Sequence, residues 1–117
     1  MLEDELSKCS HCGLCKADCP TYRVLLSELA SPRGKMLLSK EDALGRMAYL
    51  CSLCKACEVK CPAGVKICDI IMEAREKLAA QGAETEEGRK MIENIRKYGN
   101  PFGEMKEGEI PKKLFCC

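Results

Sequence analysis

The sequence predicts an all-α fold built from two halves that repeat one motif, and two observations carry this prediction. A run of four cysteines recurs after 42 residues with identical internal spacing. The apolar residues around the second run recur at the intervals of amphipathic helices, and no segment shows the sustained apolar–polar alternation of a half-buried strand. We therefore expect helices to position both cysteine runs.

The first half contains short helical segments. Ser31 and Pro32 form a favourable N-cap and N1 pair, which predicts a helix over 33–38. Ser39 followed by Asp42 predicts a further helix start, and that helix is expected to bring its last apolar residue inward. The residues at its positions i, i+3, i+4 and i+7 are Leu44, Met47, Ala48 and Cys51.

The longest predicted helix follows the second cysteine run and ends near Gly82. Glu73 and Lys77 are spaced to pair on its outer face. The apolar stripe that is expected to face the core consists of Ile67, Ile70, Ile71, Ala74 and Leu78.

A third helix is predicted between an N-cap at Thr85 and a stop at Gly99-Asn100-Pro101. The residues expected to point inward from it are Met91, Ile92 and Ile95. We expect one domain over residues 1–102, followed by a charged linker and a short apolar Cys-Cys tail over 103–117.

The two cysteine runs have the spacing that binds 4Fe-4S clusters. Each reads C-x2-C-x2-C-x3-C-P, in which one loop supplies three iron ligands and the fourth cysteine serves the other cluster of a pair. The sequence therefore predicts two 4Fe-4S clusters with crossed ligation. The expected ligands of cluster I are Cys9, Cys12, Cys15 and Cys61. The expected ligands of cluster II are Cys51, Cys54, Cys57 and Cys19.

Two other uses of the cysteines agree less well with the sequence. Zinc sites need only paired C-x2-C knuckles, so the third cysteine of each run and the following Cys-Pro favour clusters over a zinc-binding interaction module. A disulfide framework needs an oxidising compartment, whereas the acidic N-terminus lacks the apolar stretch of a secretion signal. We therefore expect a cytoplasmic protein.

Composition excludes several classes of function. Acidic and basic residues are interspersed and give a net charge of +1, so the clustered cations of a nucleic-acid-binding surface are absent. No apolar run approaches the roughly 20 residues that direct membrane insertion requires. No catalytic base, nucleophile pair or phosphate-binding loop is visible, so no catalytic residue is assigned.

Four further residues invite a functional role. His11 in the first cysteine loop is either an exposed loop residue or, when protonated, a group that raises the potential of cluster I. Cys68 is expected to be a small buried hydrophobe rather than a ninth ligand. Arg33 and Lys35 are expected on a solvated helix face, although either could contact a cluster loop or an acidic partner.

Several segments together resemble one known family of iron–sulfur domains. They are Cys9-Ser10-His11-Cys12-Gly13-Leu14-Cys15, Cys19-Pro20-Thr21-Tyr22, Ser31-Pro32-Arg33-Gly34-Lys35, Cys61-Pro62-Ala63-Gly64-Val65, Glu73-Ala74-Arg75-Glu76 and Gly99-Asn100-Pro101. They are similar to the N-terminal domain of the iron–sulfur subunits of heterodisulfide reductase, glycolate oxidase and anaerobic glycerol-3-phosphate dehydrogenase. The resemblance covers about residues 5–103 and implies an alpha-helical ferredoxin fold.

The resemblance implies an electron-transfer subunit of a larger oxidoreductase complex. The implied partners are a flavoprotein dehydrogenase and a CCG-domain or quinone-linked redox subunit, which could hold the chain at a membrane surface. Cys116 and Cys117 resemble a CC pair but lack the following glycine, so no catalytic role is transferred to them. A free diffusible ferredoxin is the alternative, although such carriers are commonly more acidic.

Overall fold

The structure is a computed structural model that describes residues 2–112. Within that range it contains helices and no strand, which confirms the all-α prediction. The α-helices are α1 (Leu2–Lys8), α2 (Pro20–Leu25), α3 (Pro32–Lys40), α4 (Ala56–Lys60), α5 (Ile67–Ala80) and α6 (Glu86–Tyr98). The 3-10 helices are η1 (Leu14–Lys16), η2 (Glu28–Ala30) and η3 (Gly45–Leu50).

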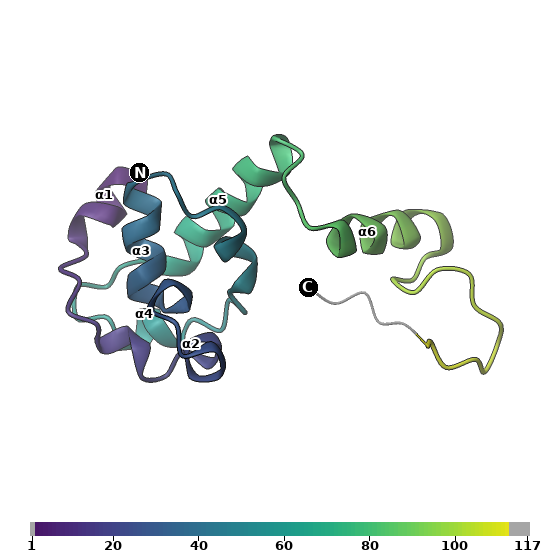
Figure 1. Cartoon of the computed structure of the whole chain (residues 1–117), viewed down its shortest axis with the longest axis horizontal. Helices are drawn as coiled ribbons and strands as arrows, with labels where there is room; N and C mark the ends of the chain where they lie inside the picture. Colours follow the sequence, from purple (N-terminus) through teal and green to yellow (C-terminus); the bar gives the residue numbers. More distant parts are fainter. Residues whose placement is uncertain (1, 113–117) are drawn as a thin grey trace.

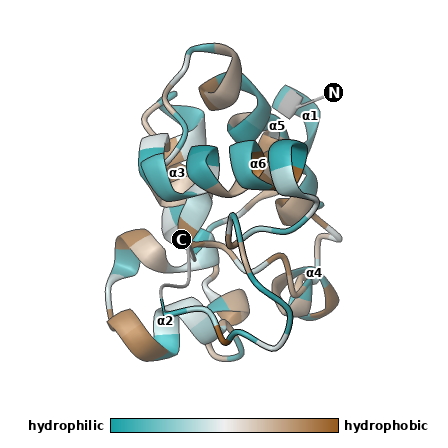
Figure 2. Cartoon of the chain, turned by 90° about the vertical axis from the view of Figure 1, so that its right-hand side faces the viewer, coloured by the Kyte–Doolittle hydropathy of each residue, from teal (hydrophilic) through white to brown (hydrophobic). Residues whose placement is uncertain are grey.

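Helices α1 to α5 pack into one body, and the last part of α5 extends out of this body toward α6 (Figure 1). The molecule is correspondingly elongated, with extents of 52 × 28 × 21 Å. In Figure 2, which faces the α6 end, hydrophilic residues dominate the ribbon of α6, whereas the end of α2 is hydrophobic. No helix in residues 2–112 is both long enough and apolar enough to cross a membrane.

The core of the body lies where one face of α5 meets α3, η3 and the loop before α5. Its most deeply buried apolar residues, each at most 1% exposed, are Met36, Ala48, Val65, Ile70 and Ile71. Burying an aliphatic side chain of this size contributes about 1.5–3 kcal/mol. The predicted apolar stripe therefore does face the core, and Glu73 and Lys77 pair on the other side at 3.3 Å.

The beginning of α5 is capped by carboxylates from two other helices. The N–H of Lys66 donates to Glu5 Oε2 of α1 at 2.9 Å, and the N–H of Cys68 donates to Glu58 Oε1 of α4 at 2.8 Å. Lys66 itself provides no side-chain cap. These bonds satisfy N–H groups that the first turn of a helix leaves without partners, and they bind α5 to both halves of the body.

The prediction that a helix starts near Ser39 is wrong. Ser39 belongs to the last turn of α3, where its hydroxyl donates to the carbonyl oxygen of Lys35 at 2.8 Å. Asp42 and Gly45 have φ of 51° and 46°, which a right-handed α-helix excludes, so the chain turns and continues as η3. Leu44 and Ala48 are nevertheless buried, as the apolar spacing predicted.

Both predicted ends of the third helix are confirmed, but its predicted inward face is wrong. Thr85 Oγ1 accepts from the N–H of Gly88 at 3.2 Å, and Gly99 ends the helix with φ of 74°. Ile92 and Ile95 are 43% and 47% exposed, and Met91 is only half-buried. Amphipathic spacing reveals an apolar face but does not identify a partner for it, and α6 lies apart from the body (Figure 1).

The segment after α6 forms turns as far as residue 112. Asn100 closes the first of them by accepting from the N–H groups of Phe102 and Gly103 at 2.8 and 3.1 Å. The predicted apolar tail Leu114–Cys117 lies outside the described residues.

Candidate functional site

Two cavities in the body are lined by cysteines, four in the first and five in the second. The first cavity has Cys9, Cys12, Cys15 and Cys61 in its wall. The second cavity has Cys19, Cys51, Cys54 and Cys57 in its wall, together with Cys68. Each cavity thus combines three cysteines of one run with the last cysteine of the other. Nine cysteines from Cys9 to Cys68 are free thiols.

The backbone of the two cysteine loops follows the sequence repeat. His11 and Leu53, each two residues after the first cysteine of a run, have φ of 58° and 57°. The left-handed conformation returns two residues later, at Gly13 and Lys55, with φ of 82° and 62°. Three of these four residues carry a side chain, for which this conformation is costly. The same left-handed conformations curl each loop around its cavity.

The fourth cysteines occupy matching positions as well. Cys19 has φ of −77° and ψ of 116°, and Cys61 has φ of −76° and ψ of 114°. Cys19 precedes Pro20 at the start of α2, while Cys61 ends α4. Both cysteines therefore leave their own run in the same extended conformation and reach the neighbouring cavity.

Helix α3 lies between the two cavities and contributes to both walls. Arg33 and Met36 line the first cavity, while Pro32 and Lys35 line the second. Residues three apart share a helix face, so neighbouring faces of α3 serve different cavities. Ile67, at the start of α5, lines both cavities and is 3% exposed. An apolar side chain thus forms their common wall.

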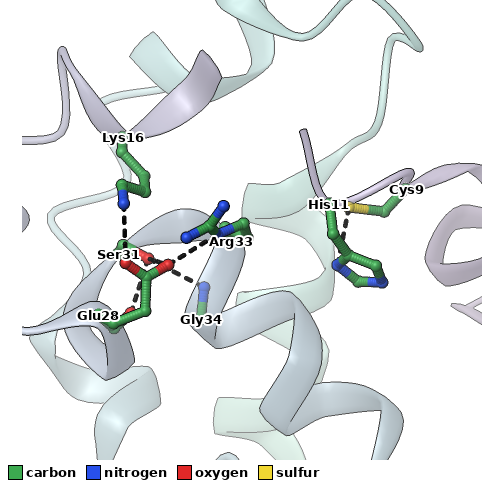
Figure 3. Close-up of polar contacts among 7 residues, drawn as sticks. All are labelled: Cys9, His11, Lys16, Glu28, Ser31, Arg33 and Gly34. Carbon is green, nitrogen blue, oxygen red and sulfur yellow. Dashed lines mark hydrogen bonds and ion pairs between the residues drawn. The ribbon is translucent and has the colours of Figure 1, made fainter. Parts of the chain in front are cut away.

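His11 contacts a sulfur of the first cavity (Figure 3). Its Nδ1 lies 3.6 Å from Cys9 Sγ, and its Nε2 lies 3.0 Å from Lys40 Nζ. Because an ammonium group only donates hydrogen bonds, Nε2 has to accept and Nδ1 carries the proton. The geometry therefore directs Nδ1 at a ligand sulfur, and the half-buried ring differs from the exposed loop residue that was one of the two expectations.

Arg33, which lines the first cavity, is paired with the carboxylate of Glu28 (Figure 3). Arg33 Nε donates to Glu28 Oε1 at 2.7 Å, and Lys16 Nζ donates to Glu28 Oε2 at 2.8 Å. Hydrogen bonds from Arg33 and Lys16 lower the pKa of Glu28 to about 2. Arg33 is only about one-third exposed, and much of its charge is balanced by Glu28.

Burial affects the pKa of two of the lining cysteines. It raises the pKa of the Cys57 thiol to about 12, with the neighbouring Cys68 and Cys51 adding to the effect, and it also raises the pKa of Cys15. The thiolate is the form that binds metal, so metal binding at these sulfurs releases protons.

Several sulfur ligands and a backbone donor surround the second cavity. In the described part of the chain, no three His, Cys, Asp or Glu side chains converge closely enough to hold a single ion. Four thiols around a cavity, with the Leu53 N–H directed at Cys51 Sγ (3.4 Å), fit a multinuclear cluster.

Two further sequence predictions can be compared with the structure. Cys68 is 3% exposed, which agrees with a small buried hydrophobe, although it also lines the second cavity. The expected solvated position of Lys35 is wrong, because this side chain is only 2% exposed. Its Nζ donates to the carbonyl oxygen of Ala30 at 2.8 Å, and this bond holds the last residue of η2 against α3.

Sequence reasoning missed two residues that support the cysteine loops. Arg75 donates to backbone carbonyls that precede Cys54, and Glu58 caps α5 beside Cys68. Arg75 follows the buried Ile71 by four residues, so it borders the buried face of α5, and this position was an available signal. Glu58 gave no such signal, since its partner is a backbone group on another helix.

The fold and the paired cavities define an all-α electron-transfer domain that carries two 4Fe-4S clusters. Residues 5–65 match the family described as "4Fe-4S dicluster domain", and the chain belongs to that family.

Relatives extend the comparison. The chain is 38% identical over 79 residues to the glycolate oxidase iron-sulfur subunit of Escherichia coli, covering 61% of this chain and 19% of that protein. It is 42% identical over 86 residues to the probable glycolate oxidase iron-sulfur subunit of Bacillus subtilis, covering 65% and 19%. It is 28% identical over 103 residues to a subunit of the ferredoxin:CoB-CoM heterodisulfide reductase of Methanosarcina mazei, covering 82% and 60%. The chain thus spans about a fifth of the first two relatives and three-fifths of the third.

Proposed function

We propose that this chain relays single electrons within a larger oxidoreductase complex of the glycolate oxidase or heterodisulfide reductase kind. When bound, each 4Fe-4S cluster supplies one-electron chemistry. The observation that carries the proposal is the pair of cysteine-lined cavities with Ile67 as their common wall. A buried apolar residue that lines both cavities would leave the two redox centres close together.

In this proposal the ligation is crossed. Cys9, Cys12, Cys15 and Cys61 hold cluster I, and Cys51, Cys54, Cys57 and Cys19 hold cluster II. The grouping of the cysteines around the two cavities supports this assignment. Leu53 and His11 add hydrogen bonds toward Cys51 and Cys9, and such bonds to ligand sulfurs tune a cluster's potential.

The proposed partners are a flavoprotein dehydrogenase subunit and a CCG-domain or quinone-linked redox subunit. Two relatives are named as subunits, which supports the presence of partner proteins in a complex. A quinone-linked partner would hold the chain at a membrane surface. The proposed electron-transfer domain spans residues 1–102, with 103–117 as an extension beyond it.

Anaerobic purification of the tagged chain from its native host tests this proposal. We expect about eight irons per chain, together with a flavin-containing or CCG-motif protein in the same complex. Recovery of the iron-loaded chain alone in every extract would overturn the complex and favour the free ferredoxin. Zinc in place of iron would overturn electron transfer altogether, and plasma emission analysis of the same sample distinguishes the two metals.

A further inference from the structure

Lys35 is a buried cation without an anionic partner in the described part of the protein. Its side chain is 2% exposed, and the carbonyl oxygen of Ala30 accepts one of its hydrogen bonds at 2.8 Å. An ammonium group has three N–H donors, and residues 2–112 provide no other acceptor for this one. No carboxylate between residues 2 and 112 forms an ion pair with it, in contrast to Arg33.

Burying an ammonium group with a single hydrogen bond is strongly unfavourable unless a negative charge lies nearby. Lys35 lines the second cavity, whose wall also contains Cys19, Cys51 and Cys54. A 4Fe-4S cluster with four thiolate ligands carries a net negative charge, which becomes one unit more negative on reduction. A cluster in the second cavity would supply the negative charge that Lys35 lacks in the described part of the chain.

We propose that Lys35 is a fixed counter-charge that raises the reduction potential of the cluster in the second cavity. A buried cation stabilises the more negative, reduced cluster more than the oxidised one, because their attraction is weakly screened by solvent. Lys35 acts on the cluster from α3 and is not a ligand. This inference rests on the proposed function, since it requires a cluster in that cavity.

Three substitutions separate the charge of Lys35 from its hydrogen bond. Lys35→Met removes both, Lys35→Gln removes the charge but keeps a donor near Ala30, and Lys35→Arg keeps the charge. The matched control is Lys55→Met, which removes a charge from the rim of the same cavity. Lys55 is exposed, so solvent screens its charge.

The measurement is an anaerobic dithionite titration of the cluster-loaded full chain, followed by electron paramagnetic resonance. The signal of each cluster is assigned beforehand with Cys12→Ser and Cys54→Ser, which lie within single runs and do not depend on the crossing. We expect Lys35→Met and Lys35→Gln to lower the potential of the cluster marked by Cys54 and to leave the other unchanged. Lys35→Arg is expected to stay near the wild-type potential, and Lys55→Met to produce a smaller shift than Lys35→Met.

Wild-type potentials in both Lys35→Gln and Lys35→Met would overturn the counter-charge while leaving the proposed electron relay intact. A lowered potential in Lys35→Met together with a wild-type potential in Lys35→Gln would assign the effect to the hydrogen bond. That result would also overturn the counter-charge. Failure of the wild-type chain to bind clusters would overturn the proposed function itself. If Lys35→Met does not fold, the comparison of Lys35→Gln with Lys35→Arg still decides the question.

Discussion

Arg75 donates two hydrogen bonds to the carbonyl oxygen of Ala48, from Nε at 3.0 Å and from Nη2 at 2.9 Å. The same Nη2 also donates to the carbonyl oxygen of Cys51. A side chain on α5 thus holds the segment that enters the second cysteine loop, 24 residues earlier in the sequence. The guanidinium also lies over the ring of Tyr49, 5.7 Å from its centroid.

Replacing Arg75 by Met should weaken the second cavity. The change removes all three hydrogen bonds from Arg75, so the Ala48 carbonyl keeps only the longer bond from the N–H of Cys51 (3.4 Å). The loss of these bonds costs about 1–3 kcal/mol. We expect a lower apparent Tm and faster loss of cluster II, both followed by visible absorbance under anaerobic conditions. Lys77→Met on the same helix removes only an exposed pair with Glu73 and should change stability by less than about 0.5 kcal/mol. Equal effects of the two substitutions would contradict the bracing role of Arg75.

Crossed ligation predicts that the last cysteine of each run affects the distant cluster. Cys19→Ser should perturb the cluster that Cys54→Ser perturbs, and Cys61→Ser should perturb the one that Cys12→Ser perturbs. The reason is that Cys19 lines the second cavity and Cys61 lines the first. Electron paramagnetic resonance of the reduced proteins gives the comparison. Uncrossed ligation would reverse both correspondences.

Gly34 should not tolerate even one added methyl group. A Cβ at this position would lie 2.8 Å from the carbonyl carbon of Glu28 and closer still to its oxygen. Gly34→Ala must therefore push η2 away from α3, and we expect a loss of about 1–3 kcal/mol in unfolding free energy. Gly88→Ala is the control, since its Cβ meets only the Thr85 hydroxyl and alanine favours helix by about 1 kcal/mol. A smaller loss in Gly34→Ala than in Gly88→Ala would show that η2 and α3 are not in tight contact.

Glu28 should stabilise the body at neutral pH and lose this effect in acid. Hydrogen bonds from Arg33 and Lys16 lower its pKa from the ordinary 4.5 to about 2. A lowered carboxyl pKa gives stability that is complete above the unfolded value and is lost as pH falls toward the folded value. The stability difference between wild type and Glu28→Gln should therefore stay constant from pH 7 to about 5.5 and shrink as pH falls from about 4.5 to 2.

Pulse proteolysis after brief exposure to each pH measures this difference, with Glu73→Gln as an exposed control that should show little difference from wild type at any pH. Since the Glu28 side chain is 42% exposed, added salt should also reduce the difference. A difference that grows as the pH falls below 4.5 would contradict the lowered pKa.

Two isoleucines should report opposite environments although both belong to amphipathic helices. Ile71 on α5 is fully buried, so Ile71→Ala should cost about 2–5 kcal/mol. Ile95 on α6 is 47% exposed, so Ile95→Ala should cost less than about 1 kcal/mol in the isolated chain. Thermal unfolding of the two variants, read by circular dichroism, checks both values. A large loss in Ile95→Ala would mean that α6 packs against the body in solution.

The sequence predicted most local features because they depend on neighbouring residues. The cap at Ser31, the ends of α6 at Thr85 and Gly99, and the buried stripe of α5 all follow from hydrogen bonds or periodicity within a few positions. The cysteine spacing likewise fixes how a loop can surround a cluster. These rules fail at Asp42, whose positive φ was not predicted from the sequence, and on α6, whose apolar face is exposed.

By itself, the sequence determined the helical class, the two clusters and the family, because each depends on residue types at fixed short intervals. Only the tertiary structure decided which buried groups face one another. It placed Lys35 in the wall of the second cavity, Ile67 between the cavities and Arg75 against the loop of Cys51. It also left the apolar face of α6 uncovered. Such contacts join residues far apart in the chain, and the helical period fixes only the direction of a side chain and not what it meets.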